Sequence, residues 1–288
     1  MFISEYKKVE KIGKGAYGIV YKAIHKETGK VVAIKKIKPS DNNEGIPATT
    51  IRETIILKNL KHENIIGLDE VLHDKDNIYL VFEYIDSDLK KLIERKRESK
   101  QLFNIDIVKS LCKQLVEAVT YCHNKGVFHR DIKPHNILIN YDMKLKLADF
   151  GLSRSISIPM RAYSLEIVTL WYRPPEILLG TEYYDASIDV WSLACIMYEI
   201  YTTEVLFKGD SEISQLEMIT KVLGSPNPEN WPNVKNMPKY KELKLNNNLP
   251  MGLNLDDPLL EDLLLQMLEY DPLNRITAEE VLSHDFFN

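Results

Sequence analysis

The sequence is poor in cysteine and lacks both a long apolar run and an excess of positive charge. Its three cysteines form an odd set without metal-site spacing, which favours a reducing intracellular compartment over secretion. The opening residues, MFISEYKK, contain no apolar signal core, and the most apolar stretch, 188–201, is interrupted by Asp189 and Glu199. We therefore expect neither a signal peptide nor a membrane partner.

The charge balance bears on the class of partner. The 288 residues include 37 Lys and Arg against 42 Asp and Glu, for a net charge of −5. A chain that coats nucleic acid by neutralising phosphates needs the opposite balance, so we expect no direct nucleic-acid partner. With 44% hydrophobic and 27% charged residues, the composition is typical of a globular chain that can bury a sizeable core.

The hydrophobic patterns change along the chain. Runs of β-branched and aromatic residues over 6–37 and 78–84 predict strands, with one helix between them at about 47–60. The later part is mostly helical, with an amphipathic helix at 105–125 and a helix at 187–201 that is apolar nearly all round. The sequence therefore predicts a sheet-rich first third and a helix-rich remainder.

One later stretch, 224–250, has a different composition. It carries five prolines and many asparagines, which interrupt helices and strands. We expect it to be irregular and to lie at the surface, as an elaboration of the fold.

Three glycines in the run GKGAYGIV mark the first candidate site. Gly13, Gly15 and Gly18 would let the backbone approach phosphate oxygens, since no Cβ intervenes. A dinucleotide-binding turn would continue directly into a helix, whereas the residues after Gly18 continue a strand. The context favours a loop that covers phosphates, with a plain glycine-rich hairpin as the alternative.

Lys35 ends the strand-like run VVAIK, and a lysine at a strand edge is the simplest interpretation. Glu53 changes that interpretation, because on a helix it shares one arc with the apolar residues Ile56, Leu57 and Leu60. A carboxylate that faces the core needs a partner, and Lys35 is the natural one. We predict that this pair holds the ammonium where it can bind nucleotide phosphates.

A denser cluster follows in the run HRDIKPHN and the later triplet DFG. The order of Gly-rich loop, VAIK, H-R-D-x-K-x-x-N and D-F-G resembles the signature set of the eukaryotic protein kinases. This resemblance implies an α+β, bilobal protein kinase fold, with a β-rich N-lobe (1–84), a hinge (85–88) and a larger helical C-lobe (89–288). It also implies that ATP and Mg²⁺ bind in the cleft between the lobes.

The resemblance implies a role for each polar residue of this cluster. Asp131 would accept or orient the proton of the substrate hydroxyl, and Lys133 would stabilise the transferring phosphate. Asn136 and Asp149 would ligate Mg²⁺ through oxygen. The residues implied around ATP are Ile12, Gly13, Gly15, Gly18, Val20, Ala33, Lys35, Phe82, Glu83, Ile85, Asp88 and Leu138. Because the catalytic positions all hold the expected residues, a kinase-shaped scaffold without activity is the disfavoured alternative.

Further runs resemble one branch of the kinases, the cyclin-dependent kinases. EGIPATTIRE at 44–53 is similar to their helix signature, and VTLWYR at 168–173, GDSE at 209–212 and LGSP at 223–226 match elsewhere. A mitogen-activated kinase would carry Thr-x-Tyr where this chain has RAYS at 161–164. A kinase outside the cyclin group is the remaining alternative.

The helix that carries Glu53 also suggests a partner. Ile51 and Ile55 point away from Glu53, with Thr54 beside them, although an exposed apolar pair is common on any surface. With the resemblance, we interpret these three residues as a cyclin-docking face. Cyclin docking is then expected to move the helix inward and complete the pair with Lys35.

The resemblance implies two phosphorylation sites. Ser164 corresponds to the activating site, and Arg52, Arg130 and Arg154 would receive its phosphate. Tyr17, in the Gly-rich loop, corresponds to an inhibitory site. Both controls would act on the same active site.

Substrates and support residues are implied in the same way. Around Val168 and Arg173 the backbone leaves no partner for an amide N–H, so protein substrates with Ser/Thr-Pro sites are expected. A buried pair between Glu176 and Arg275, and an Asp189 that braces the H-R-D loop, would be structural. The resemblance also implies a role in cell-cycle control and a location in cytoplasm and nucleus, and it allows a small adaptor subunit.

Overall fold

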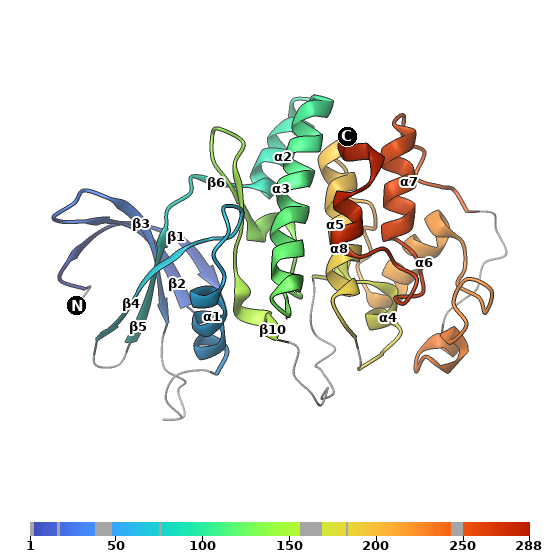
Figure 1. The fold of residues 1–288 in the computed structure, drawn as a ribbon, viewed down its shortest axis with the longest axis horizontal. Coiled ribbons are helices and arrows are strands. Elements are labelled where there is room, and N and C mark those ends of the chain that lie inside the picture. The colour runs from blue at the N-terminus through green and yellow to red at the C-terminus, as the bar shows by residue number, and fades with distance from the viewer. Residues whose placement is uncertain are drawn as a thin grey trace.

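The structure, a computed structural model, places a sheet at one end of the molecule and most helices at the other (Figure 1). It describes residues 3–15, 18–37, 48–74, 77–155, 169–182, 184–242 and 250–288. Within these residues the first part is rich in strands and the later part in helices, which is the α+β arrangement expected from the sequence. The exact lobe and hinge boundaries stay a prediction.

The sheet has five antiparallel strands in the order β1-β2-β3-β5-β4. These strands are β1 (Tyr6–Gly15), β2 (Gly18–His25), β3 (Val31–Ile37), β4 (Leu68–Asp74) and β5 (Asn77–Glu83). Among the residues described in this part, one helix is present, α1 (Ala48–Asn59). The buried Ile56 and Leu57 of α1, and Leu60 directly after it, pack into the larger hydrophobic core, which confirms the predicted apolar arc.

The second part is built mainly from helices. Its α-helices are α2 (Leu89–Glu98), α3 (Ile105–Asn124), α4 (Pro175–Leu178), α5 (Ser187–Thr202), α6 (Glu212–Leu223), α7 (Pro258–Met267) and α8 (Ala278–Leu282). Short strands complete it: β6 (Ser87–Asp88), β7 (Val127–Phe128), β8 (Ile137–Ile139), β9 (Leu145–Leu147) and β10 (Arg154–Ser155). Single-turn 3₁₀ helices lie at Pro134–Asn136, Phe150–Leu152, Leu170–Tyr172, Val234–Asn236, Tyr240–Glu242 and Asp285–Phe287.

Helix α5 is the centre of the helical core. It is buried almost all round, as its uniform hydrophobicity predicted, and Trp191 stacks on Phe207 with 5.9 Å between ring centroids. Helix α3 packs against it with a buried apolar face, and Asn104 caps the first turn of α3 through the backbone N–H of Asp106. The three cysteines are buried in this core, where burial raises the pKa of each thiol. They are therefore unreactive packing residues.

Two expectations about the fold are wrong in part. Strand β4 was not predicted; it is an edge strand whose side chains are mostly exposed, so it lacks a clear apolar run. The described part of the stretch 224–250 contains neither an α-helix nor a strand, as predicted, but it does not lie entirely at the surface. Trp231 and Val234 are buried in the core, and Trp231 stacks on Tyr270 with 6.3 Å between ring centroids.

A buried ion pair joins α4 to the C-terminal part. The guanidinium of Arg275 donates from Nη1 and Nη2 to the two carboxylate oxygens of Glu176 at 2.8 and 3.0 Å. Arg275 also donates to the backbone carbonyls of Glu269 and Ser187, so its charge is fully partnered in the core.

None of the helices in the described ranges combines the length and hydropathy that crossing a bilayer requires.

Candidate active site

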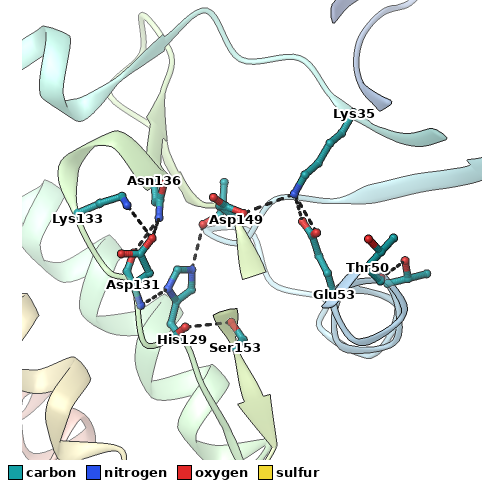
Figure 2. A network of polar contacts seen from close by, with 11 residues as sticks. Lys35, Thr50, Glu53, His129, Asp131, Lys133, Asn136, Asp149 and Ser153 are labelled. Carbon is teal, nitrogen blue, oxygen red and sulfur yellow. Dashed lines mark hydrogen bonds and ion pairs between the residues drawn. The ribbon is translucent and has the colours of Figure 1, made fainter. Parts of the chain in front are cut away.

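The predicted pair between Lys35 and Glu53 is formed in the structure (Figure 2). Lys35 Nζ, from β3, donates to the two carboxylate oxygens of Glu53, from α1, at 2.8 and 2.9 Å. The two side chains are 15% and 4% exposed. Burial disfavours the ammonium, but the charges of Glu53 and Asp149 outweigh it and raise the pKa of Lys35. Lys35 is therefore a fixed, fully charged cation.

The Gly-rich hairpin lies beside Lys35 in the sheet. Strands β1 and β2 pair with Gly15 opposite Gly18, and Val20 lies opposite Lys35 of β3. A Cβ at Gly18 would come within 2.2 Å of the carbonyl oxygen of Lys36. Gly18 is thus required by the close approach of two strands, in addition to any contact with phosphate.

The second half of the site is the loop that follows β7. Asp131 accepts from Lys133 Nζ at 2.7 Å and from Asn136 Nδ2 at 3.0 Å, and Figure 2 shows these three side chains converging. Thr169 Oγ1 donates to the other carboxylate oxygen of Asp131 at 3.3 Å. Sequence reasoning missed Thr169, which lies 38 residues away from Asp131 and carries no local pattern that points to it.

Asp189 braces this loop, as predicted. Its two carboxylate oxygens accept from the backbone N–H groups of His129 and Arg130, each at 2.8 Å. Arg130 adopts a positive φ of 69°, a strained conformation that these bonds help to hold. His123 contacts the same carboxylate at 3.0 Å. Burial opposes the charge of Asp189, yet these hydrogen bonds and the nearby histidines lower its pKa.

Asp149 lies between the two halves of the site. One carboxylate oxygen is 3.5 Å from Lys35 Nζ, and the side chain is 51% exposed. Its φ of 63° is unusual for a residue other than glycine and directs the chain into the following turn. His129 lies next to it, with Nε2 3.0 Å from the carbonyl oxygen of Ala148.

The oxygen donors present fit a magnesium ion shared with a nucleotide. Asp149 offers an accessible carboxylate, and Asn136 donates through its amide nitrogen to Asp131, which leaves its amide oxygen as the possible ligand. The described residues contain no group of three or more His, Cys, Asp or Glu side chains that could hold a metal alone. Such a site needs further oxygen ligands from phosphate or water.

The residues expected around the base lie on neighbouring strands. Ala33 pairs with Phe82 across β3 and β5, and Val20 pairs with Gly13 across β2 and β1. Leu138 is on β8, where it pairs with Asp88 of β6. Ile12 and Ile85 are partly exposed, and the buried Phe82 belongs to the core.

Two of the expected nucleotide residues have other contacts in the structure. Asp88 caps α2 by accepting from the backbone N–H of Lys91 at 2.9 Å, and it also pairs with the Lys91 ammonium. Glu83 accepts from the backbone N–H of Gly67 at 2.9 Å and pairs with Lys146 at 2.8 Å. Any contact of Glu83 with the base would therefore use its backbone.

Several expected residues lie outside the described part of the chain. These are Tyr17, Ser164 and Val168, and for Arg154 only the backbone is described. The convergence of Arg52, Arg130 and Arg154 on a phosphate stays a prediction. Arg130 itself is buried and donates to Tyr184 Oη and to the carbonyl of Leu152, each at 2.7 Å.

The side chain of Arg173, expected at the substrate-proline pocket, is held by a carboxylate of α6. Its Nη1 donates to Glu212 Oε1 at 2.7 Å, and Lys239 Nζ donates to the second oxygen of Glu212 at 2.6 Å. These contacts tie the segment after Thr169 to α6.

The expected docking face on α1 is exposed. Ile51 and Ile55 are 47% and 56% exposed, on the side opposite the buried Glu53. Thr54 donates its hydroxyl to the carbonyl of Thr50 at 2.8 Å, so its polar group is satisfied within the helix. The pair between Lys35 and Glu53 is already formed in this structure, which describes one position of α1. The inward movement of α1 on cyclin docking therefore stays a prediction.

The comparisons with known proteins agree with this geometry. Residues 6–287 match the family described as "Protein kinase domain". The two-part fold and this match show that the chain belongs to the protein kinases, and the predicted fold class is confirmed. The chain is also 51% identical to the curated Cyclin-dependent kinase 1 of Encephalitozoon cuniculi (strain GB-M1), over 98% of this chain and 96% of that relative. Within the protein kinases it is therefore a cyclin-dependent kinase.

Proposed function

We propose that this chain transfers the γ-phosphate of ATP to serine or threonine hydroxyls that precede proline. The observation that carries the proposal is the carboxylate of Asp131, held by Lys133, Asn136 and Thr169 in the same site as the Lys35 ammonium. In phosphoryl transfer a protein contributes mainly positioning and charge, and this arrangement supplies both.

Each residue of the site has a defined role in the proposed reaction. Lys35, fixed by Glu53, holds the phosphates of ATP in place, and Lys133 balances the charge that develops on the transferred group. Asp131 orients the substrate hydroxyl and accepts its proton. When bound by Asp149 and Asn136, Mg²⁺ supplies positive charge to the phosphate oxygens.

Proline selection is proposed from the segment that contains Arg173. A peptide library with Ser-Pro at its centre tests it directly, using the kinase with a cyclin bound. Replacing the proline by alanine is expected to lower kcat/KM by roughly tenfold or more, because the amide N–H it adds would be buried without a partner. An unchanged kcat/KM would remove the Ser/Thr-Pro assignment.

Activation is proposed to come from a cyclin and from phosphorylation of Ser164. The exposed Ile51 and Ile55 support the docking of an apolar partner on α1, which would stabilise the helix in the position that pairs Glu53 with Lys35. A free chain as active as its cyclin complex would contradict the first control. An unchanged activity of Ser164→Ala in that complex would contradict the second.

A further inference from the structure

A groove separate from the catalytic residues lies in the helical part. It is formed by the connection between α2 and α3, the end of α5 and the start of α7, and its volume is about 510 Å³. In Figure 1 the α2–α3 connection and the start of α7 both lie at the top of the view. The lining residues are Leu102, Phe103, Ile105, Tyr201, Asp256, Asp257, Pro258 and Leu259.

The groove gathers exposed apolar side chains. Leu102, Ile105 and Leu259 are 62%, 38% and 45% exposed, and all three line the same hollow. Phe103 is buried beside them and anchors the lining to the core. Single exposed apolar residues are ordinary on a protein surface, but three around one concave site are typical of a place where another apolar group binds.

The α7 side of the groove is acidic. In the part of the chain that the structure describes, neither Asp256 nor Asp257 has a Lys, Arg or His nitrogen within 4 Å. Asp257 accepts from the backbone N–H groups of Leu259 and Leu260, so its carboxylate is fixed at the start of α7. Burial and then the charges of Asp256 and Asp257 raise the pKa of Tyr201, which indicates that both carboxylates act on the groove. On the α2 side, Lys96 Nζ lies 5.3 Å from the centroid of the Phe103 ring.

The apolar and acidic residues of the groove together indicate which kind of ligand would bind there. An apolar side chain would remove Leu102, Ile105 and Leu259 from water, and a cation beside it would meet the carboxylates of Asp256 and Asp257. A volume of about 510 Å³ suits a few side chains of an extended segment. We propose that this groove docks a linear segment of a partner protein in which a large apolar residue lies next to Lys or Arg. The proposal goes beyond phosphoryl transfer and does not depend on it.

A positional-scanning library of biotinylated dodecapeptides tests the proposal with the full chain, without ATP. The wild type is expected to select Leu, Ile or Phe next to Arg or Lys. Leu102→Ser should weaken binding of the selected peptides at least tenfold, and Asp256→Lys should abolish the preference for Arg and Lys, because the new lysine offsets the remaining charge of Asp257. Both residues are exposed and outside the core, so the variants should fold.

The matched control is the pair Leu273→Ser and Asp142→Lys, which change an exposed leucine and an exposed aspartate elsewhere. These variants should bind the selected peptides as the wild type does. The inactive variant Asp131→Asn should also bind them, which separates the outcome from the proposed kinase activity.

Three results would overturn the proposal. In the first, the library selects no peptides that combine a basic residue with an apolar one. In the second, it selects such peptides, but Leu102→Ser leaves their affinity unchanged. In the third, sedimentation velocity finds a dimer that Leu102→Ser abolishes. The last result would assign the groove to a second copy of this chain.

Discussion

Lys35 Nζ lies 2.8 and 2.9 Å from the two carboxylate oxygens of Glu53, and this contact joins β3 to α1. This link between the sheet and the helix also fixes a positive charge in the active site. Any movement of α1 therefore changes the position of that charge, which is how a partner bound to the outer face of α1 could control catalysis.

Lys35→Met should lower kcat by about 10²–10³-fold, since a fixed cation contributes strongly to stabilising charge on transferring phosphate. Lys36→Met is the matched control, because Lys36 follows on the same strand and instead lies over the Tyr79 ring, 5.7 Å from its centroid. Phosphate transfer to a Ser-Pro peptide measures both. Equal losses in the two variants would contradict the role of Lys35.

Thr169→Ala should lower kcat roughly 2- to 13-fold, which corresponds to about 0.5–1.5 kcal/mol for one hydrogen bond to Asp131. Thr169→Ser keeps the hydroxyl and should restore most of the activity. The KM for ATP should change little, because Thr169 contacts Asp131 and not the nucleotide residues. An alanine variant with wild-type kcat would show that Thr169 does not position Asp131.

Arg275→Met should cost about 3–5 kcal/mol in the free energy of unfolding, because it leaves the buried carboxylate of Glu176 without its partner. Adding Glu176→Gln removes that unpaired charge, so the double variant should be more stable than Arg275→Met alone. Urea unfolding measures both. A double variant less stable than Arg275→Met would contradict this account of the pair.

Glu199 gives the chain a pH-dependent stability. Burial raises the pKa of this fully buried carboxyl, although it accepts from Tyr172 Oη at 2.7 Å. A raised pKa means that the folded chain holds the proton more tightly than the unfolded chain, so Glu199 contributes stability at low pH that is lost as pH rises above about 4.5.

Glu199→Gln removes this titration and keeps an oxygen that can accept from Tyr172. The free energy of unfolding of the wild type should fall, relative to the variant, as pH increases from about 4.5 toward neutrality. Urea midpoints measured across that range test the sign. A difference that is constant with pH, or that grows in favour of the wild type, would contradict the raised pKa.

Local patterns predicted much of the fold and of the site. Helical periodicity placed Glu53 with Ile56, Leu57 and Leu60 on one face, and all four are buried. The resemblance of the short run HRDIKPHN to a kinase motif placed Asp131 and Lys133 in one site, and their side chains are in contact at 2.7 Å. Such patterns succeed because they depend on residues close together in sequence.

The features that the sequence analysis missed share a cause, because each depends on contacts between segments that are distant in the sequence. Strand β4 is mostly exposed, so its pairing with β5, and not its own side chains, defines it. Proline and asparagine in 224–250 indicate an irregular backbone but carry no information about burial, and so Trp231 was misplaced. The contact between Thr169 and Asp131 and the groove at the start of α7 arise only when distant segments meet.

The central claim, that Asp131 serves phosphate transfer to a substrate hydroxyl, is tested most directly by one comparison. The rate of phosphate transfer from ATP to a Ser-Pro peptide is measured for the cyclin-bound chain and for its Asp131→Asn variant. We predict that the variant lowers kcat by about 10²–10⁴-fold and leaves the KM for ATP nearly unchanged. A variant that transfers phosphate at the wild-type rate would contradict the account.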